Sequence, residues 1–317
     1  MSAVERLQTL KGQLTNGKKA GNNNDNKFRF TLNDPTLTEE QRESYERNGF
    51  LLIRNLVPHD LLDTWSQRFR DICDGKVDSG RITLVKDISL AKSGATGERL
   101  YNKIQDFMWD DVLFRFCALP EVVKYVNCFT GPNAMAVHTM LINKPPDAGT
   151  ETSRHPLHQD LHYFPFRPAD RIVCAWTAME RVTKENGCLV VLPGTHYGTL
   201  LPHEYPEWEN GVNKMYHGVK GVDGHDRIHV EMQKGDTLFF HPILIHGSGA
   251  NRTKGFRKAI STHYAASECN YIDVRGTSQE NIAKEVEELA KKRGTPLDYV
   301  DVWRYRSRLV SGDAINL

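Results

Sequence analysis

Two histidines and one aspartate stand at a spacing that suits a metal ion. His158 and Asp160 are separated by one residue, and His246 follows far along the chain. In an extended segment residues i and i+2 point to the same side, so His158 and Asp160 can face one ion while the third ligand comes from another strand. Two imidazoles and one carboxylate leave three coordination positions of the metal open, which suits an Fe(II) that must hold a co-substrate and then O2. A structural zinc site would instead close its shell with protein ligands.

Arg257 lies eleven residues beyond His246 and adds a carboxylate-binding group. Its planar guanidinium can hold a carboxylate through two parallel hydrogen bonds. We expect that carboxylate to be the far end of 2-oxoglutarate, whose keto-acid end would chelate the iron. The order of these residues therefore predicts an Fe(II)/2-oxoglutarate-dependent oxygenase. Because Asp160 stands where iron halogenases have a small residue, hydroxylation is the expected outcome.

The same region allows a zinc interpretation. His155, His158 and His162 could line one side of a helix as a zinc cluster. Pro156 and the prolines within residues 165–168 oppose a long helix there, so this alternative is the weaker one.

A structural role for His246 is a second alternative. We expect the strand at residues 236–241 to deliver His246 into a turn of small residues, 247–249, which leaves room for a bound group. Gln159, between two candidate ligands, is expected to point away from His158, and its role stays open.

The composition limits the classes of partner. The chain has 317 residues and a net charge of +1 with both signs interspersed, which predicts no nucleic-acid partner. No apolar run approaches the roughly 18 residues of a membrane span, so we expect no membrane insertion. The N-terminus lacks the apolar core of a secretory signal. Six cysteines without a Cys-x-x-Cys pair predict reduced, buried thiols.

The N-terminal segment, residues 1–26, is expected to be a targeting helix followed by a flexible linker. Its motif Arg6-Leu7, five residues, Gln13-Leu14 fits the type 2 peroxisomal signal. On a helix the two pairs share one face, which an import receptor can bind. A solvated, fraying helix is the alternative. The C-terminal residues 314–317 do not match the Ser-Lys-Leu type of signal.

The remaining residues, 27–317, are expected to form one oxygenase domain. Thr38 and Gln41 predict a capping box, and Gly49 the end of that helix. Further helices are expected at residues 58–73, 121–129 and 278–293, the last capped by Ser278. Strands are expected at residues 50–56, 81–88, 134–143, 172–179, 188–192, 227–232, 236–241 and 258–265. This pattern predicts a β-rich fold with flanking helices, a double-stranded β-helix (jelly roll).

Long stretches of the chain resemble the phytanoyl-CoA dioxygenase family, from about residue 28 to the C-terminus. One of them is Cys128-Phe129-Thr130-Gly131-Pro132-Asn133. The other matching runs are residues 48–50, 103–107, 138–147, 152–176, 186–196, 211–215, 241–249, 255–260 and 271–280. Residues 91–98, 218–227 and 294–299 depart from the family pattern, which puts in doubt how the acyl chain and coenzyme A are held.

The resemblance implies His158, Asp160 and His246 as iron ligands and Arg257 as the 2-oxoglutarate clamp. It places Lys103, Met140 and Trp176 around the co-substrate, and it implies ascorbate as the reductant. The implied reaction is peroxisomal 2-hydroxylation of a 3-methyl-branched acyl-CoA, phytanoyl-CoA, the first step of fatty-acid α-oxidation. A hydroxylase of another small molecule and a non-catalytic binding protein are the alternatives. For the coenzyme A phosphates, the basic candidates are Lys144, Arg154 and Arg167.

Overall fold

The computed structural model describes residues 27–87, 90–91, 94–147, 149, 153–222 and 224–317. The helix and targeting motif expected in residues 1–26 lie outside this part of the chain. Among the described residues, no helix has both the length and the apolar content that a membrane crossing requires.

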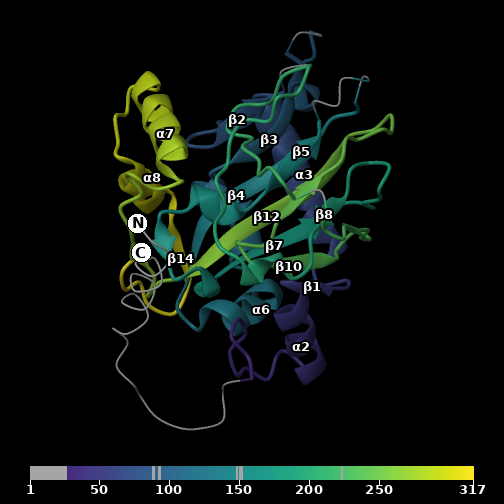
Figure 1. Ribbon diagram of the computed structural model, residues 1–317. Coiled ribbons are helices and arrows are strands. Elements are labelled where there is room, and N and C mark those ends of the chain that lie inside the picture. The colour runs from purple at the N-terminus through teal and green to yellow at the C-terminus, as the bar shows by residue number, and fades with distance from the viewer. Residues whose placement is uncertain (1–26, 88–89, 92–93, 148, 150–152, 223) are drawn as a thin grey trace.

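Two antiparallel sheets form the centre of the molecule (Figure 1). The larger sheet has the strand order β1-β10-β7-β12-β4-β3-β2, with β14 also paired to β4; the smaller has the order β5-β11-β8-β9. The strands of the larger sheet are β1 (Phe50–Ile53), β2 (Thr83–Lys86), β3 (Tyr101–Gln105), β4 (Ala134–Lys144), β7 (Ile172–Ala178), β10 (Thr237–Phe240), β12 (Arg257–Ala266) and β14 (Arg308–Ser311). Those of the smaller are β5 (His155–His158), β8 (Leu189–Val191), β9 (Ile228–Val230) and β11 (His246–Ser248), and β6 (Phe166–Arg167) pairs with β13 (Asn270–Tyr271). This confirms the expected jelly roll with flanking helices.

Most flanking helices pack on the larger sheet, whereas α7 packs on α8 and on the 3-10 helix Asp160–Tyr163. They are α2 (Glu39–Asn48), α3 (His59–Cys73), α5 (Phe114–Cys117), α6 (Pro120–Thr130), α7 (Glu280–Lys292) and α8 (Tyr299–Arg306). The capping box of Thr38 and Gln41 is confirmed, and Gly49 ends α2 with a φ of 79°. That left-handed conformation is accessible to glycine because it has no Cβ. In α3, Leu62, Trp65 and Phe69 are buried in the core.

A separate apolar core lies between the two sheets. Trp176, Leu238 and Phe240 from the larger sheet share it with Leu189 and Val230 from the smaller. All six cysteines are buried and free, as expected from their spacing.

Several expected elements differ in the structure. Ser278 is not the cap of α7: Gln279 occupies that position, and its side chain bonds elsewhere. The expected strands at 50–56 and 81–88 are shorter, ending at Ile53 and Lys86. After Ile53 the chain turns at Asn55, whose backbone N–H donates to Asp236 instead of to a neighbouring strand. Among the strands and α-helices given above, β3, β5, β6, β11, β13, β14, α5 and α8 were not predicted from the sequence.

Candidate metal and co-substrate site

The smaller sheet positions two of the three candidate metal ligands. Strand β11 pairs antiparallel with β5 so that His246 lies directly opposite His158. Asp160 was expected to continue an extended segment, but it begins the short 3-10 helix Asp160–Tyr163. Gln159 between them is extended, with φ −118° and ψ 125°, so the side chains of His158 and Asp160 still face the same side.

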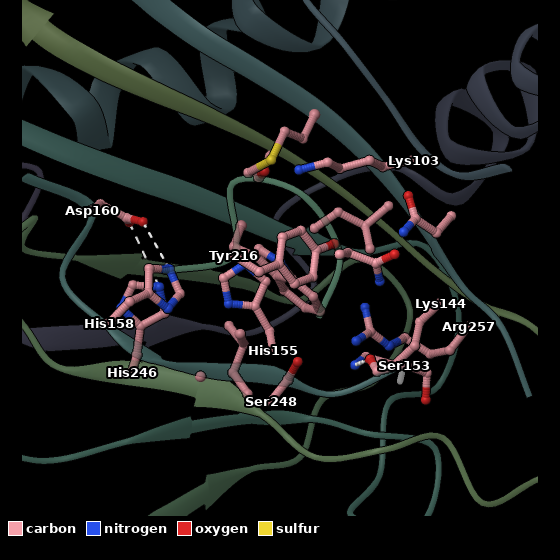
Figure 2. Close-up of a pocket in the computed structure, with 18 of the residues that line it drawn as sticks. Lys103, Lys144, Ser153, His155, His158, Asp160, Tyr216, His246, Ser248 and Arg257 are labelled. Atoms are coloured by element: carbon pink, nitrogen blue, oxygen red, sulfur yellow. Dashed lines mark hydrogen bonds and ion pairs between the residues drawn. The ribbon is translucent and has the colours of Figure 1, made fainter. Parts of the chain in front are cut away.

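These three buried side chains bring one ligand atom each to within 4.8 Å of one another. His158 Nε2 lies 3.3 Å from Asp160 Oδ1, and His246 Nε2 lies 3.7 Å from Asp160 Oδ2. Figure 2 shows the three groups together at one end of a pocket. Two imidazole nitrogens and one carboxylate oxygen that face a common centre fit a facial Fe(II) site.

The orientation of both imidazoles also fits a metal. Nδ1 of His158 donates to the carbonyl of Pro156 at 2.9 Å, and Nδ1 of His246 donates to that of Leu244 at 3.0 Å. With the proton fixed on Nδ1, the Nε2 lone pair is free to bind an ion. Burial lowers the pKa of His246 to about 4, which keeps this ring neutral at neutral pH.

The surroundings of Asp160 favour its ionised form. Burial alone would raise the pKa of its carboxyl group, but the nearby His246 and His263 outweigh burial and hold that pKa well below its usual value. His263 Nε2 donates to Asp160 Oδ2 at 2.8 Å. A carboxylate held in this way is a pre-oriented ligand.

A second group of side chains also meets the distance requirement for a metal. Asp160, Cys174 and His263 lie within the same 4.8 Å limit. Burial raises the pKa of the Cys174 thiol well above its usual value, so it stays protonated and is a poor ligand. The set with His158 and His246 is therefore the better metal site.

The position of His246 differs from the expectation in one respect. It is the first residue of β11, and residues 247 and 248 continue that strand instead of forming a turn. A Cβ on Gly247 would lie 2.9 Å from the carbonyl oxygen of His155 and 3.0 Å from that of Pro156. Glycine is needed here because it lets β5 approach closely enough to pair His246 with His158.

Arg257 begins β12 and has only 2% of its surface exposed. Its Nη2 donates to the carbonyl of Gly187 at 2.8 Å, while the buried Nε and Nη1 have no hydrogen-bond partner. Burial lowers its pKa to about 10, so the guanidinium remains charged at neutral pH. An unpaired buried cation is costly, and a bound carboxylate would satisfy its free donors.

One pocket of about 90 Å³ contains all seven residues predicted from the sequence. Figure 2 shows the metal ligands at one end and Arg257 at the other. The three remaining predicted residues line the same pocket: Lys103 from β3, Met140 from β4 and Trp176 from β7. The Trp176 ring centroid lies 5.3 Å from the guanidinium carbon of Arg257. Burial lowers the pKa of Lys103 to about 8, and its amine lies 5.0 Å from the Tyr216 ring centroid.

Two aromatic residues of this pocket were not predicted as part of the site. His155 and Tyr216 lie between the metal ligands and Arg257 (Figure 2), with ring centroids 4.1 Å apart. The His155 ring lies 4.2 Å from that of His158. Tyr216 comes from a loop, so no periodic pattern marks it. His155 was considered only within the zinc alternative.

That zinc alternative is wrong. His155 and His158 lie in a strand, and His162 Nε2 instead bonds His217 Nδ1 at 3.0 Å. The role of Gln159 is now clear: its side chain points away from the site and donates to the carbonyls of Thr199 and Ile243. It therefore ties two loops together.

Two of the basic residues considered for coenzyme A phosphates have structural partners. Lys144 is buried and donates to the carbonyls of Ser153 and Gly249. Arg167 donates to the carbonyl of Phe164 and to Gln279. Arg154 stacks on the ring of Trp208 at 3.6 Å. The side chains of Lys144 and Arg167 are thus engaged within the fold.

Comparisons with known proteins place this geometry in a family. The family model described as phytanoyl-CoA dioxygenase (PhyH) matches residues 45–259. The peroxisomal phytanoyl-CoA dioxygenase of Rattus norvegicus is 61% identical over 295 residues, which are 92% of this chain and 87% of that protein. A probable phytanoyl-CoA dioxygenase of Caenorhabditis elegans is 59% identical, covering 91% of this chain and 97% of the relative.

Solved structures share the fold at low identity. EctD from S. alaskensis, with 2-oxoglutarate and 5-hydroxyectoine, superposes with a TM-score of 0.58 at 18% identity, over 77% of this chain and 81% of that one. The epimerase SnoN, in complex with Fe3+, alpha ketoglutarate and nogalamycin RO, has a TM-score of 0.57 at 20% identity, over 76% and 88%. At these identities the likeness shows the fold alone. The family match and the curated relatives show more: this chain belongs to the phytanoyl-CoA dioxygenase family.

Proposed function

We propose that this protein hydroxylates phytanoyl-CoA at carbon 2 with Fe(II), 2-oxoglutarate and O2. The observation that carries the proposal is one pocket with the His158, Asp160 and His246 triad at one end and the unpaired donors of Arg257 at the other. The substrate comes from the names of relatives up to 61% identical over nearly the whole chain.

In the overall reaction, one oxygen atom of O2 enters succinate and the other replaces the C2–H bond of the acyl-CoA with C2–OH. 2-Oxoglutarate loses CO2 and supplies two of the electrons that reduce O2, because the C2–H bond supplies only the other two. Fe(II), when bound by His158, Asp160 and His246, supplies the oxidising chemistry that couples these two half-reactions. The products are 2-hydroxyphytanoyl-CoA, succinate and CO2.

The protein's own contribution is to bind, orient and exclude water. The two imidazoles present Nε2 to the ion because backbone carbonyls hold their Nδ1 protons. Arg257 holds the far carboxylate of 2-oxoglutarate, and Lys103 adds a second positive charge in the same pocket. Met140 and Trp176 pack against the short aliphatic chain and keep water out.

The proposal extends to the cell compartment. Relatives from Rattus norvegicus and Homo sapiens are named peroxisomal, which supports the same compartment for this chain. Residues 1–26 carry the type 2 targeting signal, Arg6-Leu7 and Gln13-Leu14, and bind the import receptor for that signal. Residues 27–317 form the oxygenase domain. Ascorbate serves as the reductant, because iron oxidised in unproductive turnovers must return to Fe(II).

Single-turnover product analysis tests the reaction. Protein incubated without O2 with Fe(II), 2-oxoglutarate and phytanoyl-CoA should, on addition of air, give succinate and 2-hydroxyphytanoyl-CoA in equal amounts. Parallel reactions with straight-chain acyl-CoA, free phytanic acid and amino acids rank the substrates. Succinate without any hydroxylated thioester, or preference for a free acid, would overturn the assignment.

A reporter fusion tests the targeting signal. Residues 1–26 joined to a fluorescent protein should direct it to peroxisomes, and the same fusion with Arg6 and Leu7 replaced by alanine should stay diffuse. Diffuse fluorescence from both fusions would contradict the proposed targeting signal without affecting the proposed chemistry.

A further inference from the structure

A second cavity, of about 520 Å³, lies between the β2 and β3 end of the larger sheet and helices α7 and α8. Figure 1 shows α7 beside this end of the sheet. Its apolar wall includes Ile82 and Leu84 from the sheet side and Leu289 and Val302 from the helices. Nothing in the proposed chemistry uses this cavity.

Neighbouring residues of β3 and of one loop line the cavity and the co-substrate pocket. Gln105 lines the cavity and Lys103 the pocket, and these residues share one face of β3, about 7 Å apart along the strand. Gln105 also lies opposite Met140 of the pocket on the neighbouring strand. Two consecutive loop residues divide in the same way: Met215 lines the cavity and Tyr216 lines the pocket.

The two volumes indicate that substrate must extend beyond the pocket. Ligand sites usually measure about 300–1,000 Å³. The pocket of about 90 Å³ lies below this range, whereas the cavity of about 520 Å³ lies within it. An acyl-CoA whose C2 sits at the metal therefore needs a second volume such as this one.

The cavity lining holds three arginines and one aspartate, so positive charge is in excess there. Arg81 and Arg293 both line it, and within the described part of the chain neither forms an ion pair with a carboxylate. Arg293 donates to the Thr83 hydroxyl at 3.2 Å. The third guanidinium, Arg306, is already paired with Asp106. Two guanidinium groups are thus available to an anion.

Aromatic rings accompany these charges. The guanidinium carbon of Arg81 lies 4.8 Å from the centroid of Tyr305, which lines the cavity, and 5.7 Å from that of Trp109. These two rings are 49% and 48% exposed. Exposed rings beside guanidinium groups offer stacking for a purine base and hydrogen bonds for phosphates.

We infer that this cavity binds the coenzyme A part of the substrate, with Arg81 and Arg293 on its phosphates and Tyr305 beside its adenine. The inference rests on the proposed function, since it concerns the same acyl-CoA. The uncharged pantetheine arm would follow the apolar wall toward Gln105 and deliver the thioester to the pocket. An alkyl chain is the poorer occupant because it would leave both guanidinium groups without a partner.

The test compares two thioesters of the same acid in the full-length protein. Phytanoyl-CoA carries the phosphates and adenine, whereas the N-acetylcysteamine thioester of phytanic acid lacks both. The double variant Arg81→Gln, Arg293→Gln should raise KM for phytanoyl-CoA at least about tenfold, because two charge-assisted contacts are lost. Its kcat, its KM for 2-oxoglutarate and its KM for the short thioester should remain those of the wild type. Lys291→Gln removes one charge from the last turn of α7, two residues before Arg293 and outside the cavity lining, and is the matched control.

Two kinetic outcomes would overturn the inference. An equal rise in KM for both thioesters would assign the cavity to the acyl chain, and no rise for either would place coenzyme A elsewhere. Calorimetry with unacylated coenzyme A separates this inference from the proposed function. If coenzyme A binds the wild type and binds the double variant at least about tenfold more weakly, the cavity assignment holds even in a protein that hydroxylates no acyl-CoA. Equal affinity for both proteins would refute it even in an active enzyme.

Discussion

His263 Nε2 lies 2.8 Å from Asp160 Oδ2, so a side chain of the larger sheet orients the one carboxylate of the proposed metal site. Groups that hold a ligand in this way typically change metal affinity by about 10–100-fold when removed. His263→Ala should therefore weaken Fe(II) binding by that factor, measured by anaerobic titration with 2-oxoglutarate present. His229→Ala, at an exposed position of β9, should bind iron like the wild type. If His263→Ala bound Fe(II) as tightly as the wild type, Asp160 would be held in place without the His263 side chain.

Arg257 should set the affinity for 2-oxoglutarate through its geometry and not only its charge. Arg257→Lys keeps a cation but loses the fork that binds a carboxylate at two points. Losing one charge-assisted hydrogen bond of about 1.5–3 kcal/mol should raise KM for 2-oxoglutarate at least about tenfold. Steady-state kinetics with saturating substrate measures this change. Lys254→Gln, in the exposed loop before β12, is the control, and an unchanged KM in Arg257→Lys would remove Arg257 from the co-substrate site.

The sequence predicted the long strands well because their side chains are buried almost without interruption. Strands β4, β7 and β12 begin and end within one residue of the expected ranges. Strands β5 and β11 were missed because they have only four and three residues and contain histidine, proline and glycine. They pair through the close approach at Gly247, which no local pattern reveals.

The candidate site was predictable only in part for a similar reason. His158, Asp160, His246 and Arg257 follow a recognisable order along the chain. Tyr216 and the arginines of the second cavity come from loops and element ends, where tertiary packing decides the position. Charge alone suggested Lys144 for coenzyme A, but its burial against two carbonyls assigns it to the fold.

Lys103 should make 2-oxoglutarate binding depend on pH. Burial lowers its pKa to about 8, so the amine is charged below this pH and neutral above it. A charged amine attracts the co-substrate, so KM for 2-oxoglutarate should rise as pH increases through about 8. Lys103→Met should have a raised KM at pH 7 that no longer shows this increase. Parallel pH profiles for both proteins would exclude Lys103 as the titrating group.

Gln279 should stabilise the short helix that carries Asp160. Its Nε2 lies 3.0 Å from each of the carbonyl oxygens of Leu161, His162 and Phe164, and its Oε1 accepts from Arg167 at 2.6 Å. Gln279→Leu leaves these buried groups unsatisfied and should lower the free energy of unfolding by about 1–3 kcal/mol, measured by urea denaturation.

Because the Gln279 contacts begin one residue after Asp160, the variant's loss of Fe(II) affinity should accompany its loss of stability. Ser278→Ala is the matched control: the neighbouring side chain is exposed and does not cap α7, so its stability should change by less than about 0.5 kcal/mol. If Gln279→Leu lost stability but bound Fe(II) like the wild type, the 3-10 helix would hold Asp160 in place without this anchor. Equal losses of stability in Gln279→Leu and Ser278→Ala would instead restore Ser278 as the cap that the sequence suggested.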